Sequence, residues 1–219
     1  MIMTGLLSLA AIIAPLCAPP ADVEALLGKL RTAYTTPQTA RIEVNVRQEM
    51  RDGFAEFVVK LDFQRANKVY LEVYQENRFR FGAVSDGIKI AALGDDKKVI
   101  ETKDWDVVAM TEVIPANLET ICFYDYARQL STDEGANMHG SKLTITKNEV
   151  WNEKTWTILE EVAPDVGVIV KYFIDKQTHL IWRTLVRNME TNKLMQDCQV
   201  VRVETGITFD PNRFVIPKS

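Results

Sequence analysis

The sequence predicts a mainly β fold of the α+β type: an incomplete, half-open antiparallel β-barrel of about 10–11 strands, with an N-terminal helix and a mid-chain lid helix. Three observations lead to this prediction. Short runs of alternating apolar and polar residues extend over most of the chain, as strands with one buried face require. Turn dipeptides such as Asp52-Gly53 separate the runs and leave no room for crossover helices. A long meander of this kind must close or curl to protect its edge strands.

The C-terminal third shows the alternation most clearly. Four runs follow one another, at 155–162, 168–174, 179–187 and 194–203, and the chain closes on 209–217. Connections this short join neighbouring antiparallel strands. The region therefore predicts one wall of the half-barrel, and it contains no catalytic chemistry.

Residues 1–18 predict a signal peptide. The apolar core of about ten residues is uncharged and too short to span a bilayer, but it fits the h-region of a signal peptide. The segment before this core lacks Lys and Arg, and Cys17 leaves a lipid anchor open as a second interpretation. A buried N-terminal helix is the third. We expect export to the periplasm or cell envelope, with residues 21–219 as a single domain.

The first half of that domain predicts one helix and six strands. Residues 21–34 have the apolar spacing of an amphipathic helix, which Thr35-Thr36-Pro37 ends. The apolar positions are Val23, Leu26, Leu27, Leu30 and Tyr34. The six alternating runs that follow are 41–48, 54–63, 68–74, 78–84, 88–93 and 97–102.

The middle of the chain breaks this rhythm. Between Pro115 and Leu130 the apolar spacing becomes helical, and proline suits a first helical turn. Two compatible interpretations stay open: a helix that covers one end of the sheet, and a mobile lid over an apolar cavity. The polar segment 131–141 reads as a loop.

Composition and motifs exclude several classes of function. The net charge of −4 argues against a nucleic-acid binder, which needs an excess of basic residues. His139 and His179 lie far apart in the sequence without a nearby cysteine, so we expect no metal site. No glycine-rich phosphate loop, Gly-x-Ser-x-Gly elbow or His-Glu-x-x-His motif occurs. We therefore expect no catalytic residues, no cofactor and no enzyme.

Cys122 and Cys198 are the two cysteines that remain beyond residue 18. In an oxidising compartment they can form a disulfide that closes a loop of about 75 residues, worth about 3–4 kcal/mol in the chain-entropy account. The alternative is two small buried apolar side chains, since both cysteines lie in apolar surroundings. Both interpretations stay open.

Without catalytic groups, a curved sheet whose inward face is apolar indicates a binding protein for acyl chains or other apolar ligands. A filled core without a cavity is the competing account. The candidate cavity residues are Phe57, Val59, Leu61, Phe63, Phe79 and Phe81 from the strands, and Leu118, Ile121, Phe123 and Tyr126 from the mid-chain helix.

Four segments carry a family resemblance. Residues 61–70 hold a strand that ends in Arg65 and a second strand with an aromatic residue, and 84–87 place Ser-Asp-Gly before the next strand. Residues 171–180 read as a strand, an Asp, a turn with Thr and a strand, and 207–217 contain a terminal Phe-x-x-Pro segment. In this the chain resembles the bacterial lipoprotein-carrier superfamily, the periplasmic LolA/LolB-like proteins, over nearly its whole length beyond residue 20.

The resemblance implies an eleven-stranded incomplete barrel whose concave apolar face holds lipoprotein or lipid acyl chains under covering helices. It implies that Arg65 latches the lid helix, although Ala66 stands where the family has proline. A solvated arginine at a strand end is the alternative. The superfamily also includes lipoprotein acceptors and sensing domains of envelope-stress regulators, so a scaffold that binds an envelope protein partner is the second functional hypothesis.

Overall fold

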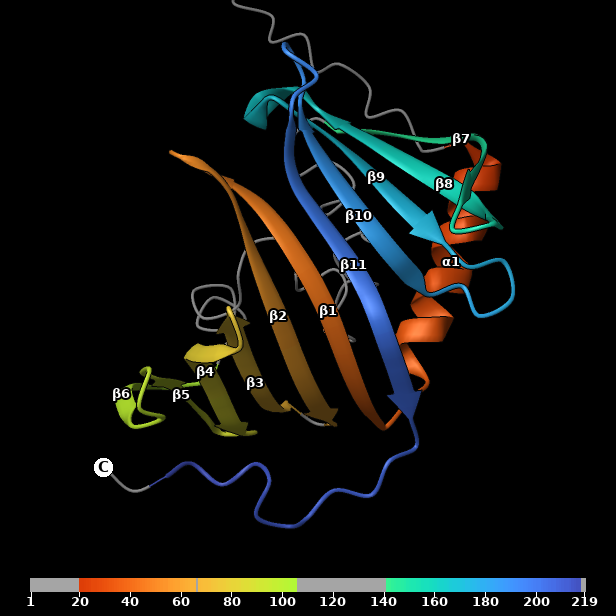
Figure 1. Cartoon of the computed structure of the whole chain (residues 1–219). Coiled ribbons are helices and arrows are strands. Elements are labelled where there is room, and N and C mark those ends of the chain that lie inside the picture. Colours follow the sequence, from red (N-terminus) through yellow and green to blue (C-terminus); the bar gives the residue numbers. More distant parts are fainter. Residues whose placement is uncertain (1–19, 66, 106–140, 218–219) are drawn as a thin grey trace, which may run out of the picture.

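The structure is a computed structural model that describes residues 20–65, 67–105 and 141–217. One antiparallel sheet of eleven strands, with the order β6-β5-β4-β3-β2-β1-β11-β10-β9-β8-β7, makes up most of the described chain (Figure 1). The elements are α1 (Ala21–Thr35), β1 (Thr39–Met50), β2 (Gly53–Gln64), β3 (Lys68–Gln75), β4 (Arg78–Asp86), β5 (Lys89–Leu93), β6 (Val99–Asp104), β7 (Lys142–Trp151), β8 (Lys154–Ala163), the 3-10 turn η1 (Pro164–Val166), β9 (Val168–Ile174), β10 (Ile181–Asn188) and β11 (Leu194–Thr205).

The sheet consists of two meanders that meet at its centre. The first runs outward from β1 to β6, and the second runs inward from β7 to β11, which pairs with β1 in antiparallel register. Among the described residues β6 and β7 form the two edges and do not pair with each other. The barrel is therefore incomplete, as the sequence predicted.

Helix α1 forms where the apolar spacing predicted it. Its first turn carries Asp22 and Glu24, whose negative charge suits the positive end of the helix dipole. The five apolar residues of the predicted stripe are all buried. They belong to one hydrophobic cluster with the inward residues of both meanders, and α1 packs in the concave face of the sheet on the side of β7–β11 (Figure 1).

The strands confirm the predicted alternation. In β1 and β2, twelve residues each pair in unbroken register from Thr39 opposite Gln64 to Met50 opposite Gly53. Ile42, Val44 and Val46 are buried, whereas the residues between them face the outer side. Two meanders that share this pattern make one continuous apolar surface on the inside of the curve.

Several strands begin or end beside residues whose backbone has a positive φ, in the left-handed region. Glu76 and Asn77 have φ values of 50° and 61° in the turn between β3 and β4, the type I′ geometry that suits a two-residue hairpin. Lys97, at φ 62°, belongs to a turn, and β6 therefore begins at Val99 and not at residue 97. His179, at φ 55°, likewise delays the start of β10 to Ile181.

The closing segment, residues 206–217, is not a strand. It leaves β11 and runs past the lower ends of β1, β2 and β3 (Figure 1). The backbone N–H of Gly206 donates to the carbonyl of Thr39 at 3.1 Å, and side chains add further contacts. The Arg213 guanidinium bonds the buried Asp62 carboxylate at 2.6 Å and lies 3.8 Å from the centre of the Tyr70 ring. Asp62 also accepts two bonds from Arg41, so one buried carboxylate fastens this segment.

Several predictions fall outside the described residues: the signal peptide at 1–18, the mid-chain helix at 115–130 with its four candidate cavity residues, Cys122 and His139. In the described part of the chain, no helix is both long and apolar enough to cross a membrane.

Candidate functional site

The sequence predicted an apolar ligand cavity on the concave face of the sheet, and the structure places its described candidate residues as follows. Val59, Leu61 and Phe63 on β2 are buried in the same cluster as α1, and Phe57 and Phe81 pack against that cluster while partly exposed. Their side chains alternate with outward residues such as Val58 and Lys60. Among the described residues, α1 is the helix that contacts this surface.

Phe79 does not lie with the other candidate residues. The register between β3 and β4 shifts after Val73, so Phe81 pairs with Val73 whereas Phe79 pairs with Tyr74. The Phe79 ring meets the Tyr74 ring edge-on, with 5.8 Å between centroids. It packs in a small cluster with Val84 and residues of β5 on the outer side. Residues two apart share a face in a regular strand, but a bulge reverses the side chain.

Arg65 contacts the C-terminal end of α1, and the mid-chain helix that it was expected to latch lies outside the described residues. Its Nη2 donates to the carbonyl oxygen of Tyr34 at 2.9 Å, and its Nε donates to that of Pro37 at 3.0 Å. Its backbone N–H donates to Gln38 at 2.9 Å. Arg65 is therefore not a solvated strand end, and its guanidinium fork is already committed to the C-terminal end of α1 and the residues that follow.

Tyr34 fastens α1 at a second point. Its hydroxyl oxygen accepts a hydrogen bond from the backbone N–H of Ile181 at 3.0 Å, at the start of β10. Arg65 follows β2, so the end of α1 is bonded to both meanders. The helix thereby bridges the two halves of the sheet.

The concave face also holds polar groups. The Tyr172 hydroxyl donates to Glu161 at 2.8 Å. Thr184 pairs with Tyr172 and Cys198 across β9, β10 and β11, and its buried Oγ1 has no hydrogen-bond partner within the described part of the chain. The second meander is thus less uniformly apolar than the first.

The Cys198 side chain has no exposed surface, and no disulfide joins it to another described residue. Burial, together with the neighbouring charge of Asp197, raises the pKa of this thiol to about 12. A thiol with such a pKa is protonated at neutral pH and a poor nucleophile. The disulfide with Cys122 stays a prediction, since Cys122 lies outside the described residues.

Aromatic side chains cover the outer side of the second meander. Trp151 and Trp156 flank the β7–β8 turn with ring centroids 5.4 Å apart, and Trp156 Nε1 donates to the carbonyl of Trp151 at 2.9 Å. The two rings therefore pack together at the end of the β7–β8 hairpin. Arg183 lies over the Trp151 ring and binds Asp197 through two hydrogen bonds, of 2.9 and 2.7 Å.

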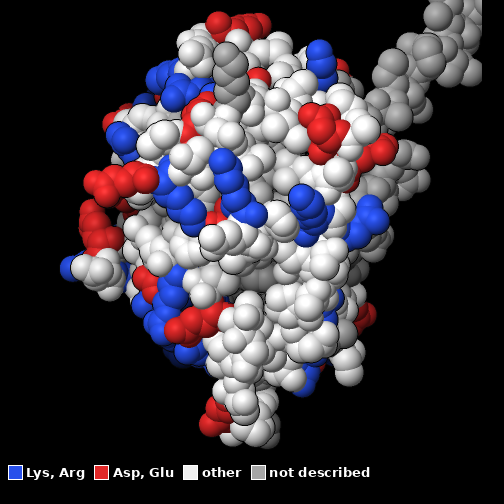
Figure 2. All heavy atoms as spheres, turned by 90° about the vertical axis from the view of Figure 1, so that its right-hand side faces the viewer, with Lys and Arg blue, Asp and Glu red and all other residues white. Residues whose placement is uncertain are grey.

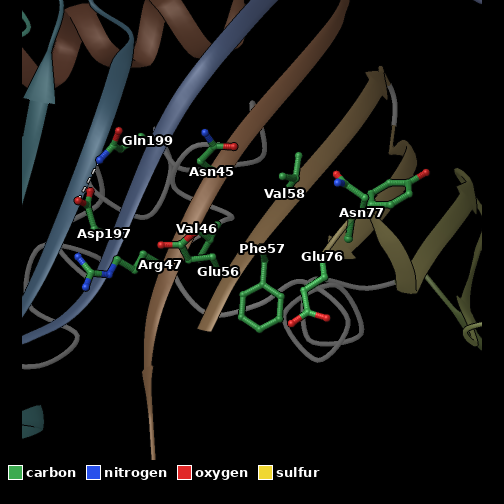
Figure 3. Close-up of a pocket in the computed structure, with 11 residues that line it drawn as sticks. Asn45, Val46, Arg47, Glu56, Phe57, Val58, Glu76, Asn77, Asp197 and Gln199 are labelled. Carbon is green, nitrogen blue, oxygen red and sulfur yellow. Dashed lines mark hydrogen bonds between the residues drawn. The ribbon is translucent and has the colours of Figure 1, made fainter. Parts of the chain in front are cut away.

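A polar hollow of about 550 Å³ lies beside this arginine, on the outer side of the sheet where β11, β1 and β2 run together (Figure 3). Its lining residues are Asn45, Val46, Arg47, Glu56, Phe57, Val58, Tyr74, Glu76, Asn77, Asp197 and Gln199. Apart from Phe57, the sequence did not single out any of them. Polar residues that alternate with buried ones look like an ordinary solvated strand face, and no local signal distinguishes a hollow from a flat surface.

Charge is mixed on the surface. On the side that carries α1 and β7, basic side chains are interspersed with acidic ones (Figure 2). Within residues 20–65, 67–105 and 141–217, no group of three His, Cys, Asp or Glu side chains is placed to hold a metal ion.

No protein-family model matches the chain, and no curated protein matches it. Several solved structures match the chain. MucB is 16% identical over 90% of this chain and 64% of that chain, with a TM-score of 0.52. The Pseudomonas aeruginosa MucA/MucB complex is 16% identical over 89% and 60%, with a TM-score of 0.51. An uncharacterised conserved protein from Thermus thermophilus is 10% identical over 88% and 92%, with a TM-score of 0.57.

These similarities concern the fold. The chain spans under two thirds of the length of the MucB chains that it matches. Its half-open antiparallel sheet with a helix in the concave face is the fold that it shares with MucB. A shared fold does not by itself fix the function.

Proposed function

We propose that this protein is an exported binding protein of the cell envelope, with residues 21–219 as one domain, that holds acyl chains of lipids or lipoproteins against its concave face. One observation carries the proposal. The concave surface is apolar along both meanders, and α1, which forms no backbone pairing with any strand, covers it on the side of β7–β11 (Figure 1).

The few hydrogen bonds that attach α1 to the sheet would allow an acyl chain to displace it from the concave face. Its hydrogen bonds to the sheet come from Arg65 and from the Tyr34 hydroxyl, both at its C-terminal end. The rest of the helix is held by apolar side chains. Moving α1 aside breaks no strand pairing, so the half-barrel can keep its shape while the helix gives way.

The energies of the exchange are of similar size. Burial of Val23, Leu26, Leu27 and Leu30 contributes about 6–12 kcal/mol at about 1.5–3 kcal/mol for each side chain. An acyl chain with about 14 buried methylenes contributes about 11 kcal/mol at about 0.8 kcal/mol each. A ligand of this kind can therefore replace the helix at little net cost, which favours reversible loading.

Lipid analysis of the protein tests the proposal. The full chain, purified from cells in which it reaches the envelope, should carry acyl species that organic extraction and mass spectrometry detect. A parallel purification of Val59→Asp, which puts a carboxylate on the concave face, should recover several-fold less. Lys60→Asp, one residue along β2 and facing outward, is the matched control and should retain the wild-type load. Recovery of no acyl species from the wild-type chain would remove the carrier function.

A second candidate function rests on the similarity to MucB. MucB is described in complex with MucA, and this chain shares its fold over most of its length. The candidate is a scaffold or sensing domain that binds an envelope protein. Arg65→Leu separates the two: a carrier should change the amount of acyl ligand that it retains, whereas the scaffold should bind its partner unchanged and carry no lipid in either form.

A further inference from the structure

Apart from Val46 and Phe57, the residues that line the outer hollow belong to the face of the sheet opposite the proposed acyl site. The hollow's wall residues Asn45, Val58 and Tyr74 alternate along the strands with the concave residues, so they face away from α1. A volume of about 550 Å³ lies within the range of small-molecule sites, about 300–1,000 Å³.

Side-chain amides stand on both sides of this hollow. Asn45 on β1 lies opposite Gln199 on β11, and Asn77 in the β3–β4 turn lies across from them (Figure 3). Gln199 donates one N–H to Asp197 at 3.0 Å and keeps its carbonyl oxygen. The Asn45 and Asn77 side chains make no hydrogen bond within the described chain. Each amide can both donate and accept, as a ligand hydroxyl does.

Between the amides, the surface is apolar and aromatic. Val58 lies between Asn45 and Tyr74 in one cross-strand row, half-buried, and the Tyr74 ring closes that side. A ligand with a C–H face and hydroxyl groups on its rim fits such a surface. An acyl chain does not, because polar groups dominate the lining.

The charges of the hollow are nearly balanced. Arg47 and the adjoining Arg183 stand against Glu56, Glu76 and Asp197. Arg183 is committed to Asp197, and Arg47 stacks on the Phe54 ring at 4.3 Å. The Lys60 ammonium lies 5.4 Å from the centre of the Tyr74 ring, beside the hollow. A phosphate would still meet three carboxylates, whereas a neutral ligand meets donors and acceptors in similar number.

We propose that this outer hollow binds a neutral saccharide of one or two rings, with the sugar C–H face on Val58 and Tyr74 and its hydroxyls on Asn45, Gln199 and Asn77. The same chemistry is offered by a free sugar and by the end of a glycan chain. The hollow is open on one side, so both can enter it.

Titration of the ¹⁵N-labelled full chain with maltose, cellobiose and N,N′-diacetylchitobiose tests the proposal. At least one sugar should shift the backbone amides of residues 45, 58, 74, 77 and 199 in a saturable way. Asn45→Ala and Gln199→Ala should each weaken binding about three- to tenfold, the value of one hydrogen bond. Asn148→Ala, on the exposed side of β7, is the matched control and should bind like wild type. Tetrasaccharides of the same units separate the two sources of the ligand. If they bind more tightly than the disaccharides, the ligand is the end of a glycan chain, and if they bind equally, it is a free sugar.

Two results would overturn the assignment. One is the absence of saturable shifts at these amides with all three sugars. The other is a response at the same amides to spermidine alone, which would make the hollow a cation site. Both alanine variants replace exposed or half-buried side chains, and a well-dispersed amide spectrum shows in the same experiment that each is folded.

Discussion

Arg65, the first residue after β2, donates its Nη2–H to the carbonyl oxygen of Tyr34 at 2.9 Å. Tyr34 lies in the last turn of α1, a turn that has no basic residue of its own. The positive charge that suits the C-terminal end of a helix dipole therefore comes from the sheet. This contact joins the C-terminal end of α1 to the end of β2 in the first meander.

Replacing this arginine should loosen α1. Arg65→Leu removes two charge-assisted hydrogen bonds and leaves two carbonyl oxygens without their donor, and we expect a loss of about 1.5–3 kcal/mol in the free energy of unfolding. Urea unfolding measures the loss, and hydrogen exchange should show faster opening of the amides of residues 23–34. Arg78→Leu, an exposed arginine of β4, is the control and should change neither quantity. Unchanged exchange in α1 would show that Arg65 does not hold the helix.

Replacing Gly28 and Gly82 by alanine should change the free energy of unfolding in opposite directions. Gly28 lies in the exposed middle of α1 with no atom within 4 Å of an added Cβ, so Gly28→Ala should stabilise the protein by about 0.5–1 kcal/mol. At Gly82 on β4, an added Cβ would collide with the backbone carbonyl of Leu71 and approach the Phe79 ring to 3.2 Å. Gly82→Ala should therefore destabilise by about 1–3 kcal/mol. Equal effects of the two substitutions in urea unfolding would contradict the packing around β4.

Local periodicity was sufficient to predict most of the fold. The alternation of Ile42, Val44 and Val46 and the helical spacing in 21–34 each depend on one stretch of chain, and both appear in the structure where expected. The incomplete barrel follows from many such strands and short turns. The antiparallel pairing of β1 with β11 could not be predicted from local sequence patterns, because it joins residues that lie far apart in the sequence.

The candidate site depends more on such distant contacts, and less of it could be predicted. Phe57, Val59, Leu61 and Phe63 share a face as expected, but a bulge turns Phe79 away, and bulges have no fixed sequence signal. The bonds from Arg65 to the carbonyls of Tyr34 and Pro37 could not be predicted, because they join residues that lie far apart in the sequence. The expected latch to the mid-chain helix stays a prediction. In the sequence, Asn45 and Gln199 have the pattern of ordinary solvated strand residues, and only the pairing of β1 with β11 places them opposite each other.

Asp175 should make stability depend on acid pH. Burial alone would raise the pKa of its carboxyl, but hydrogen bonds from Lys154, the backbone of Thr178 and Gln177 and the Thr178 hydroxyl outweigh burial and lower the pKa to about 2. The folded state therefore holds this carboxylate ionised more strongly than the unfolded chain does. The resulting stability, about 2 kcal/mol, is present above about pH 4 and is lost as the pH falls towards 2.

Urea unfolding of wild type and Asp175→Asn at pH 6 and at pH 2.5 measures this contribution. The difference in free energy between the two proteins should shrink by most of that amount at the lower pH. Asp165→Asn, in the exposed turn η1, is the control and should differ from wild type by the same small amount at both pH values. A difference for Asp175→Asn that is independent of pH would contradict the lowered pKa.

The Cys198 thiol should be unreactive while the protein is folded. Its burial and the charge of Asp197 raise its pKa to about 12, so almost no thiolate exists at pH 8 and a reagent cannot reach the sulfur. In a variant with Cys17→Ser and Cys122→Ser, Ellman's reagent should react with Cys198 only after urea is added. Rapid reaction of the folded variant would contradict the buried environment in β11. The wild-type chain then tests the bridge to Cys122: in urea without reductant, a bridged Cys198 stays unlabelled, whereas a free Cys198 reacts as it does in the variant.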